Sequence, residues 1–126
     1  MTFLAATPAL PVRDVARAVA FYRERLGFES PHVDPGFAVM RRDRVEIHLW
    51  EANNPSCPGA EPFLAGSASC RVRVTGLPQL YAEFQAQGVV HPNGALAGRP
   101  WGVDDFTILD IDGNAIGFDA PTGADS

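Results

Sequence analysis

Residues 11–28 read PVRDVARAVAFYRERLGF and predict an amphipathic helix whose two ends are both marked. Asp14 is a good N-cap, because its carboxylate can accept a hydrogen bond from an otherwise free backbone N–H of the first turn. Gly27 stands where a left-handed residue commonly ends a helix. The apolar residues recur at helical spacing along one face: Val15, Ala18, Val19, Tyr22 and Leu26.

The remainder of the chain predicts strands, one more helix and a long loop. Asp-Gly-Asn at 112–114, between apolar residues, is a strong hairpin signal. Three prolines and two glycines make residues 51–66 a loop or linker. Strands are expected at 3–12, 37–40, 45–50, 69–75, 106–110 and 115–119, and the second helix at 76–87.

The two halves of the sequence repeat each other. A shift of 62 residues superimposes the two helices, and a shift of 69 superimposes the two hairpins and places Phe37 on Phe106. Such a duplication dictates the architecture. We therefore expect an α+β fold of two βαβββ modules, residues 1–62 with the linker and residues 63–126, in one compact domain around a cleft.

The first expected strand, residues 3–12, contains Pro8 and Pro11. Proline has no N–H to donate to a β-ladder, so it is confined to edge strands and irregular positions. This strand therefore lies at an edge or leaves its own sheet.

Composition bounds the function. All ten basic residues are Arg, which excludes mechanisms that need a lysine amine, such as Schiff bases and phosphate-binding Walker loops. The formal net charge is −5, and residues 63–126 hold three Arg against seven acidic residues. Such an acidic surface repels nucleic acid and anionic membranes. A cationic ligand is therefore a better candidate partner than either.

The two cysteines, Cys57 and Cys70, lack CxxC spacing, so neither a disulfide framework nor a zinc knuckle is expected. We expect reduced thiols in a cytoplasmic protein, with the role of Cys57 left open. The sequence shows neither an apolar run of transmembrane length nor an export signal.

The duplicated modules, the opening stretch 11–28 and the closing stretch DIDGNAIGF (110–118) resemble the vicinal oxygen chelate superfamily. This group includes glyoxalase I, extradiol dioxygenases, fosfomycin-resistance proteins and bleomycin-binding proteins. Its metalloenzymes bind a divalent ion through strand side chains of both modules. The resemblance places the four ligand positions here at Thr7, His48, Ser69 and Gly117.

Only His48 is a usual metal ligand among these four, because glycine has no side chain and hydroxyls bind metals weakly. A catalytic site needs about three good protein ligands. We therefore expect no metal and no other cofactor. A non-standard site built from His48, Glu46 and a loop histidine, either His32 or His91, is the open alternative.

Two stretches resemble the bleomycin-binding branch of the superfamily more closely: PGFAVMRRDRVEIHLWE (35–51) and RPWGVDDFTILDIDGNAIGF (99–118). The resemblance implies that Trp101 and Phe37 sandwich the flat bithiazole of the drug. It also matches Pro8 to a proline near which the N-terminal strand crosses to the partner subunit of a homodimer.

The residue types support this interpretation independently, since a planar cationic ligand needs aromatic faces and carboxylates. An alternative role, packing in the interior or against the linker, stays open for three of the aromatic residues: Trp50, Phe63 and Phe106. The candidate ligand-binding residues are Trp101, Phe37, Trp50, His48, Phe106, Phe63, Gly102 and Asp104.

The sequence thus predicts a non-catalytic, metal-independent homodimer that sequesters a bleomycin-type antibiotic. Its clefts are expected between the first module of one chain and the second module of the other. Two alternatives stay open. One is a metal-dependent enzyme of the glyoxalase or dioxygenase type, and the other is a binding protein for a different small aromatic molecule.

Overall fold

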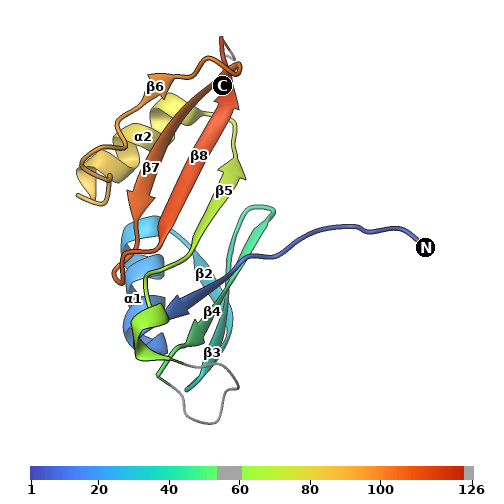
Figure 1. Ribbon diagram of the computed structural model, residues 1–126, viewed down its shortest axis with the longest axis vertical. Coiled ribbons are helices and arrows are strands. Elements are labelled where there is room, and N and C mark those ends of the chain that lie inside the picture. Colours follow the sequence, from blue (N-terminus) through green and yellow to red (C-terminus); the bar gives the residue numbers. More distant parts are fainter. Residues whose placement is uncertain (54–60, 124–126) are drawn as a thin grey trace.

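The structure is a computed structural model that describes residues 1–53 and 61–123, and Figure 1 shows the arrangement of its elements. Cys57 and part of the loop expected at 51–66 lie outside the described residues. The elements in chain order are β1 (Ala9–Val12), α1 (Val15–Leu26), β2 (Glu29–Asp34), β3 (Phe37–Arg42), β4 (Val45–Glu51), the 3₁₀ helix η1 (Pro62–Leu64), β5 (Ser69–Arg73), α2 (Leu77–Ala86), β6 (Ala97–Gly98), β7 (Val103–Leu109) and β8 (Ala115–Pro121).

The strands form two four-stranded sheets of the same topology, β1-β4-β3-β2 and β5-β8-β7-β6. Strand β1 is parallel to β4 in the first sheet, and β5 is parallel to β8 in the second. All other neighbouring strands are antiparallel. Helix α1 packs on the first sheet and α2 on the second. The expected α+β fold of two βαβββ modules is confirmed, while the module boundary at residues 62 and 63 stays a prediction.

The expected ends of α1 are confirmed. The Asp14 carboxylate accepts a hydrogen bond from the Arg17 N–H at 3.0 Å, and Gly27 adopts a left-handed φ of 74°. No strand was expected at β2, because ESPHVD contains Pro31 and lacks an apolar alternation. It forms the exposed edge of the first sheet, where a proline is tolerated.

The hairpins of the two modules differ by one residue, which the sequence repeat did not reveal. Arg42 pairs with Val45 across residues 43–44, whereas Asp110 bonds Asn114 across the longer turn 111–113. Because strand side chains alternate between faces, a one-residue slip moves each side chain of β7 to the opposite face.

A buried polar cluster joins the two modules. The Asp110 carboxylate accepts hydrogen bonds from the Tyr22 hydroxyl at 2.8 Å and from the Asn114 side-chain amide at 2.9 Å. The same amide donates to the carbonyl of Pro11 at 2.8 Å. Burial, and then the charge of Asp110, raise the pKa of Tyr22 well above its usual value, so the hydroxyl remains a donor. The turn of the second hairpin is thereby fixed to β1 and α1 of the first module.

Residues 1–7 are exposed and leave the body of the molecule as an extended segment (Figure 1). Two apolar side chains on it are almost fully exposed, Phe3 at 92% and Leu4 at 91%. Neither of the two α-helices described is long and apolar enough to cross a membrane.

Candidate functional site

The first sheet has an open face on the side opposite α1, which we call face A. Core residues of β3 and β4 alternate with the residues of this face, as the period of a strand requires. Face A consists of His32 from β2, Phe37, Val39 and Arg41 from β3, and Glu46, His48 and Trp50 from β4.

The polar and aromatic side chains of face A contact one another in a continuous row. Glu46 accepts hydrogen bonds from Arg41 at 2.7 Å and from His48 at 2.7 Å. Both hydrogen bonds hold the pKa of the Glu46 carboxyl below its usual value, and the bond from Arg41 has the larger effect. The Phe37 ring meets the His48 ring edge to face at 5.0 Å, and the His32 ring lies on its other side at 6.3 Å.

Phe37 is therefore a half-buried ring held between two histidines, and Trp50 is its cross-strand neighbour on β4. Aromatic rings fixed in this way present a stacking surface with little rotamer freedom left to lose. Of the candidate residues, face A thus brings together Phe37, His48 and Trp50.

The second sheet has an equivalent open face opposite α2, which we call face B, and it carries charges rather than rings. Face B consists of Arg71 and Arg73 from β5, Asp105 and Thr107 from β7, and Gly117 and Asp119 from β8, with the side chain of Arg99 reaching in from the loop before β7.

Both carboxylates of face B lie beneath arginine side chains. Asp105 accepts from Arg99 Nε at 2.7 Å and Arg71 Nη2 at 2.9 Å, and Asp119 accepts from Arg73 Nε at 2.6 Å. Burial acts to raise the pKa of Asp105, but the hydrogen bonds from Arg99 and Arg71 outweigh it and the net pKa is lowered. The aspartate therefore stays ionised and paired.

Phe106 does not lie on either open face. Its side chain is fully buried and packs against Phe84 and Phe118, on the helix side of the second sheet. The reason is the one-residue difference between the hairpins: the structural equivalent of Phe37 is Asp105, and that of Phe106 is Ala38. The sequence alignment of the two modules thus assigned Phe106 to the wrong face.

The other four candidates lie outside both open faces. Trp101 and Gly102 form the exposed turn before β7, with Trp101 68% exposed. Asp104 alternates with Asp105 and so projects from the opposite face of β7, where Thr122 Oγ1 lies 3.4 Å from its carboxylate. Phe63 is exposed on η1.

The acidic surplus counted in the sequence overstates the free negative charge. Asp105 and Asp119 are paired with arginines on face B, and Asp110 is buried in the cluster that joins the modules. Asp112 is half-buried, and burial, more than the charge of Asp110, raises the pKa of its carboxyl. Sequence counting could not separate structural carboxylates from free ones, because most of their partners lie far away in the chain.

The four positions implied for a metal do not fit one. Thr7 belongs to the exposed N-terminal segment, and the space beside Gly117 is taken by the guanidinium of Arg71. The alternative set of His48, Glu46 and His32 shares face A, yet within residues 1–53 and 61–123 no three His, Cys, Asp or Glu side chains are grouped to hold a metal.

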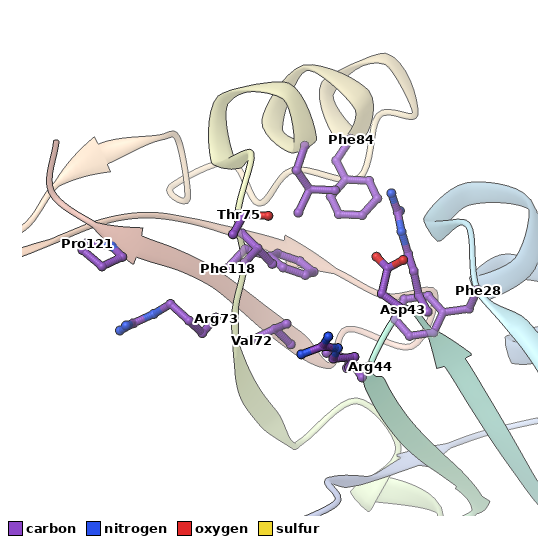
Figure 2. A pocket seen from close by; sticks show the side chains of 13 residues that line it. Phe28, Asp43, Arg44, Val72, Arg73, Thr75, Phe84, Phe118 and Pro121 are labelled. Atoms are coloured by element: carbon purple, nitrogen blue, oxygen red, sulfur yellow. The ribbon is translucent and has the colours of Figure 1, made fainter. Parts of the chain in front are cut away.

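A separate groove of about 750 Å³ lies on the helix side, between the turn after β3 and the second sheet with α2 (Figure 2). Phe84 and Phe118 line it, but they are nearly buried by core packing and offer no free ring face for stacking. None of the eight candidate residues lines this groove.

Two βαβββ modules, each with an open sheet face, are the architecture expected of the vicinal oxygen chelate superfamily. A family model described as "Bleomycin resistance protein-like N-terminal" matches residues 7–41. The chain is 42% identical over 125 residues to a bleomycin resistance protein of Geobacillus stearothermophilus, covering 91% of this chain and 95% of that one. This chain belongs to the bleomycin resistance protein family.

Two solved structures share the fold. The bleomycin-binding protein of Streptomyces verticillus, complexed with copper(II)-bleomycin, superimposes with a TM-score of 0.76 at 28% identity, over 94% of this chain and 96% of that one. A bleomycin resistance determinant encoded on the transposon Tn5 also gives 0.76, at 27% identity, over 95% and 99% of the two chains.

Proposed function

We propose that this protein binds a bleomycin-type antibiotic and holds it without making or breaking a bond. The observation that carries the proposal is an aromatic face A and an arginine-rich face B, without a metal-binding set among the described residues, in a chain 42% identical to a bleomycin resistance protein. Sequestration needs only tight binding and enough protein: a Kd of ~100 nM corresponds to about −9.5 kcal/mol.

The proposed contacts are Phe37, His48 and Trp50 on face A, the turn of Trp101 and Gly102, and Phe63 at the rim. Asp104 follows this turn but projects from the face of β7 opposite face B, so we propose it as a carboxylate at the rim for a cationic group of the ligand. We place the protein in the cytoplasm, where sequestration would keep the antibiotic from DNA.

We further propose a homodimer in which face A of one chain and face B of its partner enclose each cleft. The exposed N-terminal segment supports this arrangement, since exposed Phe3 and Leu4 side chains are costly in a monomer and find cover on a partner. Each open sheet face would then be covered.

The first test is a titration of chelator-treated protein with metal-free bleomycin and with its copper complex, followed by tryptophan fluorescence and by heat. We expect sub-micromolar binding of one ligand per chain, because stacked rings and paired charges act together in one enclosed cleft. Mass spectrometry of the recovered antibiotic should show an unchanged molecule. Absence of binding at tens of micromolar, or a chemically altered antibiotic, would contradict the proposal.

Deleting residues 1–7 is expected to convert the dimer to a monomer, because the deletion removes the exposed apolar side chains that a partner would cover. Light scattering should then give the mass of one shortened chain, below the 13.5 kDa of the 126-residue chain, in place of the mass of two. Phe3→Ser with Leu4→Ser is the milder variant and should weaken the dimer in the same direction. A full-length protein that is already monomeric at micromolar concentration would rule out the dimer.

A further inference from the structure

Face B holds three arginines for two carboxylates. Asp105 has Arg99 at 2.7 Å and Asp119 has Arg73 at 2.6 Å, so each carboxylate keeps a close partner of its own. Arg71 adds a second contact to each, at 2.9 Å to Asp105 and 3.6 Å to Asp119. The guanidinium of Arg71 is thus the surplus positive charge of this face.

The position of Arg71 exposes that charge. Its side chain crosses its register partner Gly117, and a Cβ on Gly117 would lie 3.5 Å from Arg71 Nη1. A side chain longer than alanine at 117 would therefore displace the guanidinium. The Arg71 side chain is 56% exposed, and its Nη1 makes no hydrogen bond to another described residue. Two carboxylates hold the group from beneath while its outer edge stays open.

A fixed guanidinium with free N–H donors is suited to oxygen acceptors, which it can engage through two parallel hydrogen bonds. Because both carboxylates are already neutralised by other arginines, the third guanidinium is repelled by its positive neighbours. An oxygen acceptor on the open side relieves this repulsion. We infer that Arg71 binds an oxygen acceptor of the ligand, such as a carboxylate, sulfate or amide carbonyl oxygen. This inference rests on the proposed function, because it places the acceptor in the same cleft.

The principal test compares the bleomycin affinity of the wild type with that of three variants. Arg71→Gln should weaken binding at least tenfold while leaving the thermal midpoint nearly unchanged, since Asp105 keeps Arg99 and Asp119 keeps Arg73. Gly117→Val retains the charge but displaces it and should weaken binding similarly. Arg23→Gln, which removes the same charge from the exposed side of α1, is the control and should bind within twofold of the wild type.

A second measurement needs neither a variant nor bleomycin. Sodium sulfate is titrated into ¹⁵N-labelled wild-type protein at constant ionic strength, and the arginine side-chain N–H resonances are followed. The resonance of Arg71 should shift saturably, and that of Arg23 should not.

The outcomes separate the inference from the proposed function. If wild type binds bleomycin and Arg71→Gln binds equally well, the inference is overturned and the proposed function stands. If wild type does not bind bleomycin, the proposed function fails and sulfate decides. A saturable shift at Arg71 then supports an oxygen-acceptor site for a different ligand, and no shift overturns the inference. The sulfate result also decides should Arg71→Gln not fold.

Discussion

Replacing Asp110 with alanine is expected to lower the free energy of unfolding by about 4 kcal/mol. The carboxylate accepts four hydrogen bonds in a buried cluster, from the Tyr22 hydroxyl, the Asn114 side-chain amide and the backbone N–H groups of Asp112 and Asn114. Alanine supplies no acceptor. Each donor left unpaired and buried costs ~1–3 kcal/mol, so even partial rehydration leaves a large loss.

The measurement is urea unfolding followed by tryptophan fluorescence, at one fixed protein concentration because association would add to the apparent stability. Tyr22→Phe removes a single hydrogen bond and should cost about 1.5–3 kcal/mol. The double variant should cost less than the sum of the two, since both changes act on one bond. Glu24→Ala on the exposed side of α1 should stay within about 0.5 kcal/mol. A loss below ~1 kcal/mol for Asp110→Ala would show that this cluster does not join the modules.

The fold could be predicted because its signals are local and repeated. Helix α1 is specified by its N-cap, its C-terminal glycine and one apolar face, and the duplication of strand and turn patterns dictates two similar modules. Tyr22 lies on the apolar face that the helical spacing predicted, and its side chain is fully buried. Its hydroxyl partner could not be predicted, because Asp110 lies 88 residues away in the chain.

The site could be predicted only in part, for two physical reasons. A single residue added to the turn of the second hairpin reversed the faces of β7, which exchanged Phe106 for Asp105 at the open face. Face B also depends on long-range ion pairs: Arg71 and Asp105 are 34 residues apart, and Arg73 and Asp119 are 46 apart. Neither pair leaves a periodic signal in the sequence. In contrast, the expected strand 45–50 is confirmed, and the alternation of side chains along a strand suffices to place His48 and Trp50 on one face.

Replacing Trp101 with alanine is expected to weaken bleomycin binding about 30-fold, which corresponds to ~2 kcal/mol. The indole is 68% exposed, yet hydrogen bonds fix the backbone on both sides of its turn. Arg99 N–H donates to the Val103 carbonyl at 2.7 Å, and Thr122 N–H donates to the Gly102 carbonyl at 2.9 Å. A large exposed ring on a fixed backbone contributes little to folding but offers its faces to a planar ligand without a rearrangement of the loop.

The same exposure predicts that Trp101→Ala leaves the thermal midpoint within about 2 °C of the wild type, since little packed surface is lost. Trp101→Phe retains a stacking face and should lose less than about fivefold in affinity. Ile111→Ala, which shortens an exposed apolar side chain in the turn after β7, serves as the control and should bind like the wild type. If Trp101→Ala binds within twofold of the wild type, the ligand does not stack on this turn. The aromatic contacts would then reduce to those of face A. Equal losses from Trp101→Ala and Phe37→Ala would instead support one ligand held between the two rings.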